Sequence, residues 1–221
     1  MTIQRKKFAE GYCFEKIFAF FMVGCIIGVV YETILAFVTQ HGLLQPHVGL
    51  IYGPFNPVYG IGFSLFYILL GKNTESRNGW VTYIYCCLIG GATEYLISYL
   101  EQVFLHTQAW NYSHLFLNIQ GRTTVPFMLF WGLGGYVLLR WVYPALSKFI
   151  EQFPYQLGKK ITTFLVVFIL FDSIVTFLAV YRQSQRELGV PATNLVAELC
   201  DYYFPNDVMD KIFQNVHEVK K

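Results

Sequence analysis

The chain has 221 residues, of which 55% are hydrophobic, 19% aromatic and 14% charged, with a mean hydropathy of +0.43. A soluble domain carries about 25% charged residues, so a surface of this composition is better solvated by lipid than by water. The net charge of +2, without a Lys/Arg cluster among aromatic residues, argues against a nucleic-acid partner.

Five apolar segments predict the fold class. Each approaches the roughly 20 residues that cross a bilayer, and helices are expected because lipid cannot hydrogen-bond an open backbone. We therefore predict an all-α polytopic membrane helix bundle with about five transmembrane helices, at Lys16–Val38, Phe55–Gly71, Trp80–Phe104, Val125–Tyr143 and Ile161–Tyr181. The aromatic residues expected at membrane interfaces are Trp80, Trp141, Tyr143 and Tyr181.

The distribution of Lys and Arg predicts the topology. The N-terminal arm and the second and fourth connections are rich in basic residues, whereas the first loop has none and the third has only Arg122. The positive-inside rule then places the N-terminus in the cytoplasm and the first and third loops outside. The first segment follows basic residues, as a signal peptide does, but it contains Glu32 and lacks a cleavage motif. We expect a retained helix in a multi-pass protein of the cell membrane.

The C-terminal tail is predicted to be folded outside the lipid. We divide the chain into a transmembrane domain, 1–182, and an extramembrane helical tail, 183–221. By this count the tail falls outside the cell. Arg182 and Arg186, which flank the fifth segment, conflict with that position, and a further re-entrant segment could return the tail to the cytoplasm. Asn206 is expected to cap a short amphipathic helix that lies on the membrane or covers the bundle, with an apolar face of Val208, Met209, Ile212, Phe213 and Val216.

Ionisable residues inside the apolar segments are the first functional signal. Each costs about 2.5–3.5 kcal/mol on insertion scales, so Glu32, Glu94, Glu101 and Asp172 are candidates for function. In the first segment Gly24 and Gly28 are four residues apart, and Glu32 follows at the same spacing on the same helix face. The third segment carries a similar face: Cys87, Gly91, Glu94, Ser98 and Glu101. Because small residues let helices approach closely, we expect these two stripes to pack together.

The first loop enters the second segment through Gly53-Pro54-Phe55-Asn56-Pro57-Val58-Tyr59-Gly60. Proline removes amide donors and glycine permits unusual dihedral angles, so bent backbone is expected here, of the kind that forms a re-entrant segment lining a cavity. Together with the third loop, it predicts one polar binding site in the outer half of the bundle. Its candidate residues are Glu32, Asn56, Tyr59, Glu94, Glu101, Trp110, Tyr112, Asn118 and Arg122.

A structural role is the alternative for several of these residues. Arg122 could bridge Glu32 and Glu94 and make them tolerable in lipid. Glu101 could face interfacial water. For Asp172, a contact with a partner subunit, a hydrogen bond to Thr176 and chemistry all remain open.

Motifs for known chemistry are absent from the sequence. There is no G-x-x-x-x-G-K-[ST], no G-x-S-x-G and no H-E-x-x-H. The five cysteines contain no C-x-x-C pair and are expected to be apolar filler. The histidines at 41, 47, 106 and 114 lack the spacing of metal ligands, so we predict neither a metal nor a cofactor. Whether the chain is an enzyme stays open, and the absence of nucleotide-binding, hydrolase and metal motifs argues against it.

Three blocks of residues resemble the CmpB-like family, whose members are described as type IV permeases of ABC transporters. The blocks are Gly28 with Tyr31-Glu32, then Gly49–Pro54 with Pro57–Gly62, then Trp110–Tyr112 with Asn118, Gly121-Arg122 and Trp131-Gly132. They span residues 20–145. One departure is His47-Val48, where the family would have Asn-Arg before the glycine, which puts a basic role there in doubt.

The resemblance implies a permease-like transport subunit, whose energy would come from a separate nucleotide-binding subunit or an ion gradient. Two alternatives are kept. One is an intramembrane enzyme acting on lipid or a lipid-linked substrate, with Glu32 or Glu94 as general base and Arg122 on an anionic headgroup. The other is a non-catalytic interaction or regulatory subunit. Membrane lipid is an expected partner in each case, and a homo-oligomer is a further prediction.

Overall fold

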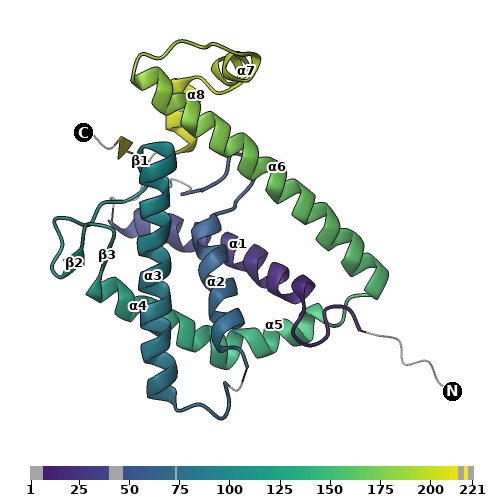
Figure 1. The fold of residues 1–221 in the computed structure, drawn as a ribbon. Coiled ribbons are helices and arrows are strands. Elements are labelled where there is room, and N and C mark those ends of the chain that lie inside the picture. The colour runs from purple at the N-terminus through teal and green to yellow at the C-terminus, as the bar shows by residue number, and fades with distance from the viewer. Residues whose placement is uncertain (1–6, 40–46, 73, 214–216, 219–221) are drawn as a thin grey trace.

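The computed structural model describes residues 7–39, 47–72, 74–213 and 217–218, and the described chain is almost entirely helical (Figure 1). The helices are α1 (Phe14–Thr39), α2 (Pro57–Leu70), α3 (Gly79–Leu105), α4 (Val125–Val137), the π-helix η1 (Leu138–Val142), α5 (Tyr143–Ile150), α6 (Tyr155–Glu187), α7 (Leu195–Tyr203) and α8 (Asn206–Ile212). Two antiparallel strand pairs join β1 (Thr107–Gln108) to β4 (His217–Glu218), and β2 (Asn118–Ile119) to β3 (Thr123–Thr124).

Four of these helical runs are long and apolar enough to cross a membrane: 14–38, 79–105, 125–150 and 155–187. The prediction of a membrane helix bundle is therefore confirmed. The second segment needs a correction, because α2 has only 14 residues. At 1.5 Å per residue it covers about 21 Å, less than the roughly 30 Å of a bilayer core. The fourth span also continues past Tyr143, through η1 and α5.

Helix α1 packs antiparallel against α2 through small residues. A Cβ atom added at Gly28 would lie 2.4 Å from the ring of Tyr59, and one added at Gly60 would lie 2.4 Å from the Cys25 sulfur. Such distances leave room only for glycine, which confirms that the G-x-x-x-G stripe of α1 is a helix-packing surface.

The third helix uses its small residues in the same way, but against α4. An added Cβ at Gly90 would lie 2.3 Å from Trp131, and one at Gly132 would lie 2.2 Å from the Cys87 sulfur. The expected direct packing of the α1 and α3 stripes is therefore wrong. Each stripe is covered by the helix that follows it in sequence, as is usual because consecutive elements tend to be neighbours in space.

The main apolar core lies where α1, α2 and α5 meet, around the fully buried rings of Phe20 and Phe66. Tyr143 belongs to this core: it is 3% exposed and its hydroxyl donates to the Phe63 carbonyl. Its predicted place in the interfacial belt is thus wrong, since its hydroxyl finds a partner inside the bundle. Trp80 and Trp141, at 76% and 61% exposure, fit such a belt.

Ion pairs fix which elements share one end of the bundle. Lys16, near the start of α1, pairs with Glu151 after α5, and Lys159 of α6 pairs with Glu15. The hydrogen bond and charge of Lys16 hold the pKa of Glu151 below its usual value. We call this the N-terminal end. At the opposite end β4 pairs with β1, so the last described strand lies beside the third loop.

The tail therefore shares the third loop's side, and helix α6 crosses the bundle once, from Tyr155 to Glu187. A further re-entrant segment returning the tail is excluded for the described residues. This relative topology agrees with the prediction, whereas the cytoplasmic position of the N-terminus stays a prediction.

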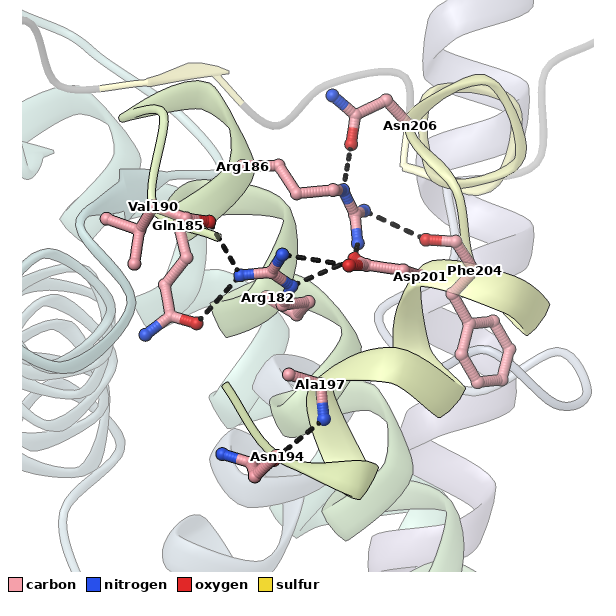
Figure 2. Close-up of polar contacts among 9 residues, drawn as sticks. All are labelled: Arg182, Gln185, Arg186, Val190, Asn194, Ala197, Asp201, Phe204 and Asn206. Carbon is pink, nitrogen blue, oxygen red and sulfur yellow. Dashed lines mark hydrogen bonds and ion pairs between the residues drawn. The ribbon is translucent and has the colours of Figure 1, made fainter. Parts of the chain in front are cut away.

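Two arginines fasten the tail to the end of α6 (Figure 2). Both oxygens of Asp201 accept from Arg182 at 2.8 Å, and Arg186 adds a bond of 2.7 Å. Hydrogen bonding to Arg182, then to Arg186, lowers the pKa of Asp201 to about 2. The two arginines therefore hold the tail on the side of the third loop, where they remain an exception to the positive-inside rule.

Helix α8 covers the bundle rather than lying apart from it. Met209 and Phe213 pack against Ala179 and Val180 of α6. Asn206 is not the cap, because α8 is preceded by Pro205 and the Asn206 side chain accepts from Arg186 at 2.6 Å. The structure adds α7, which the sequence analysis missed, capped by Asn194. The predicted apolar position Val216 lies outside the described residues.

Candidate functional site

The segment before α2 dips between α1 and α6, as the glycine and proline pattern predicted. The Asn56 amide donates to the carbonyl of Cys25, in the middle of α1, at 3.1 Å. The Ile51 amide donates to Thr176 at 3.0 Å, in the interior of α6. Gly53 has a φ of +85°, which favours glycine, and it turns the chain toward α2. The backbone at this depth is re-entrant, and the amides of Ile51, Tyr52 and Asn56 donate to groups of α1 and α6.

Asp172 is the main support of this segment. Its side chain is fully buried, and Oδ1 accepts from the Tyr52 amide at 3.1 Å and from the Thr176 hydroxyl at 3.3 Å. Of the alternatives left open for Asp172, the hydrogen bond to Thr176 is present. Irregular backbone at membrane depth needs such internal partners, which accounts for an acid in this span.

Two carboxylates on different helices lie above the start of α2. Glu32 of α1 accepts from the hydroxyl of Tyr59. Glu94 of α3 is only 6% exposed, and it accepts from Thr123 at 2.5 Å and from Tyr112 at 3.3 Å. Each acid therefore has a tyrosine partner, and the tyrosines come from α2 and the third loop.

These two acid–tyrosine pairs form one polar cluster. The hydroxyl of Tyr112 is close enough to Glu94 and Glu32 for both charges to act on it: burial raises the pKa of Tyr112 above its ordinary value, and the two carboxylates raise it further. Trp131 flanks the cluster, with its ring 5.4 Å from that of Tyr59. We define the polar cluster as Glu32, Tyr59, Glu94, Tyr112 and Thr123.

Arg122 borders this cluster without bridging its acids. Its guanidinium donates to Gln102 and, at 3.5 Å, to Ser98, both on α3. It also lies over the rings of Tyr99 and Tyr95, at 5.3 and 5.7 Å. The predicted bridge from Arg122 to Glu32 and Glu94 is therefore wrong. Polar and aromatic side chains of α3 bind the guanidinium group instead.

A basic side chain beside Glu32 comes from the first loop. His47 lies with Nδ1 3.7 Å from the Glu32 carboxylate. His47 and Val48 stand where the family has Asn-Arg. Although the arginine is missing, the imidazole of His47 still places a basic group beside Glu32.

The other predicted site residues support local structure around the cluster. Glu101 accepts from the Ala109 amide at 3.2 Å, and Trp110 donates to the Arg122 carbonyl at 2.8 Å. Asn118 bonds within its own loop, accepting from Gly121 at 3.0 Å. Asn56 caps α2 through the Val58 amide at 3.2 Å. These side chains hold the third loop and α2 in position.

Two neighbours of the cluster were not among the predicted residues. Thr123 follows Arg122 directly and is 2% exposed, and Trp131 lies two turns into α4. A polar residue immediately before an apolar helix reads as a helix start, so its use as a carboxylate partner had no sequence signal. Among the described residues no group of three His, Cys, Asp or Glu side chains could hold a metal ion; His41 lies outside them.

Comparison with known proteins gives one match. The family model described as Putative ABC-transporter type IV, ABC_trans_CmpB, matches residues 19–177. That range contains the polar cluster, the re-entrant segment and Asp172. No curated protein and no solved structure matched the chain. With a membrane helix bundle and a family match across most of its length, the chain belongs to the CmpB family of Putative ABC-transporter type IV proteins.

Proposed function

We propose that the chain is a permease-like subunit of a membrane transporter and that the polar cluster is its solute-binding site. The observation that carries this proposal is the pairing of Glu32 with Tyr59 and of Glu94 with Tyr112 beside a re-entrant segment. Acids inside membrane spans are costly and mark solute or ion pathways. Half-length helices entered by irregular backbone are a recurring form of such sites.

The chemistry of the cluster favours a solute with a positive charge or several hydrogen-bond donors. Two carboxylates and two phenol oxygens supply acceptors, and Arg122 is engaged by Gln102 and Ser98 instead of neutralising them. A bound cation would offset the mutual repulsion of Glu32 and Glu94. Energy for uphill transport would come from a separate nucleotide-binding subunit, since the sequence has no nucleotide-binding motif.

The test compares cells that lack the chain with cells in which it is restored at native level. Intracellular and medium solutes are profiled together with membrane lipids. We expect one class of cationic or polyhydroxy solute to change, and the change to require an ATP-hydrolysing partner recovered with the tagged chain. A change confined to lipid composition would support the enzyme alternative and contradict the proposal.

A further inference from the structure

A cavity with several polar residues in its lining lies at the N-terminal end of the bundle, opposite the polar cluster. Its volume is about 540 Å³, within the range of small-ligand sites of about 300–1,000 Å³. It opens between the end of α2, the following connection and the η1–α5 junction. Its polar lining includes Arg140, Glu75, Thr74 and Ser147.

The π-helix places Arg140 in this lining. Pro144 has no amide hydrogen for the Arg140 carbonyl four residues earlier, so a regular α-helix is interrupted there. The chain responds by widening one turn, in which the Tyr143 amide donates to the Leu138 carbonyl. Such turns are often found at functional sites. Arg140 and Pro144 both line the cavity, so the widened turn presents a cationic side chain to it.

The guanidinium of Arg140 is only partly used by the protein. One terminal nitrogen donates to the Arg77 carbonyl at 3.0 Å, and the group lies 5.7 Å from the Tyr136 ring centre. Its Nε atom is buried and has no hydrogen-bond partner among the described residues. The protein therefore satisfies the hydrogen-bonding capacity of this guanidinium group only in part.

Among the described residues, no hydroxyl group of the lining accepts from Arg140 Nε. Thr74 donates to the Leu70 carbonyl at 2.9 Å, and Ser147 donates to Glu151 at 3.1 Å. An anion held in the cavity would pair with the guanidinium group of Arg140, which lines it.

The cavity lies at the depth where lipid headgroups are found. Trp141, next to Arg140, is 61% exposed, and Trp80 at the start of α3 is 76% exposed. Exposed tryptophans at the ends of membrane spans mark the interface between acyl chains and water.

We propose that this cavity binds a phosphate ester of the kind carried by phospholipid headgroups, with Arg140 as the anion-binding residue. A planar guanidinium pairs well with phosphate oxygens. Glu75 lines the same cavity and is exposed, so its carboxylate opposes a bare phosphate dianion and attracts a headgroup amine. The fit is therefore best for a zwitterionic headgroup such as phosphoethanolamine, and inorganic phosphate should bind less well.

Native mass spectrometry of the delipidated full chain in a maltoside detergent tests the proposal. Phosphatidylethanolamine, phosphatidylglycerol and inorganic phosphate are titrated separately. We expect phosphatidylethanolamine to bind most tightly and Arg140→Gln to weaken it about tenfold, the loss of one charged hydrogen bond. Lys148→Gln removes an exposed cation of α5 at the same end and should change nothing. Glu75→Gln should remove the preference for ethanolamine over glycerol.

Two results would overturn the proposal. One is equal retention of phosphatidylethanolamine by wild type and Arg140→Gln. The other is Arg140-dependent binding of inorganic phosphate without binding of lipid, which would make the ligand a soluble anion. If Arg140→Gln fails to fold, Glu75→Gln still decides the matter, because an unchanged headgroup preference in that surface variant contradicts the assigned geometry.

Discussion

At the scale of single residues, Asp172 shows how a membrane acid can be structural. Its carboxylate holds the Tyr52 amide at 3.1 Å in the re-entrant segment. We expect Asp172→Ala to lower the free energy of unfolding by about 1–3 kcal/mol, because a buried amide loses its acceptor. Detergent-titration unfolding measures this. Asp172→Asn keeps an acceptor oxygen and should cost less.

The matched control for this residue is Asp207→Ala, since the Asp207 side chain is 70% exposed. An Asp172→Ala variant no less stable than that control would contradict the supporting role. The sequence alone could place Asp172 in a span and pair it with Thr176, four residues away on the same helix. It could not reveal the bond to Tyr52, because that contact depends on how far the first loop enters the bundle.

At the scale of elements, packing of α1 on α2 positions the acid–tyrosine pair. A Cβ at Gly28 would meet the ring of Tyr59 at 2.4 Å. We expect Gly28→Ala to destabilise the protein by about 1–3 kcal/mol, through overpacking that displaces Tyr59. Gly134→Ala is the control, because an added Cβ there meets nothing within 4 Å. Thermal unfolding of both variants in one detergent checks the difference, and equal stability would refute close packing here.

The junction of the tail with α6 predicts a dependence on pH. The pKa of Asp201 is lowered to about 2 from an ordinary 3.8 by its bonds to Arg182 and Arg186. A lowered carboxyl pKa contributes stability that is complete above pH 4 and lost as the pH falls toward 2. Pepsin cleavage of the 188–194 connection should therefore increase over that window. Asp201→Asn should already be cleaved at pH 4, and identical profiles for both proteins would contradict the clamp.

At the scale of the whole molecule, composition and the apolar segments were enough to predict the helix bundle and its relative topology. The pairing of helices was not predictable, because small-residue stripes on α1 and α3 look alike whichever neighbour covers them. The same limit applies to the polar cluster. The sequence pointed to Glu32, Tyr59, Glu94 and Tyr112. It also predicted that Arg122 bridges the two acids, whereas its guanidinium group donates to Gln102 and Ser98 of α3.

The absolute orientation is tested by accessibility of single cysteines in a cysteine-free chain. Position 75 lies at the N-terminal end, and position 190 lies in the tail at the opposite end. With the N-terminus in the cytoplasm, an impermeant thiol reagent applied to intact cells should label position 190 and leave position 75 unlabelled. The reverse pattern would invert the assignment while preserving the fold.

The central claim is that the polar cluster binds the transported solute, and Glu94→Gln tests it most directly. The amide keeps the size of Glu94 and still accepts from Thr123, while the charge is removed. We predict that this variant keeps its free energy of unfolding within about 1 kcal/mol of wild type, as a shape-conserving change allows. The solute change that depends on the chain should disappear, and the exposed control Glu198→Gln should retain it. Wild-type solute levels with Glu94→Gln, or a loss fully explained by unfolding, would contradict the claim.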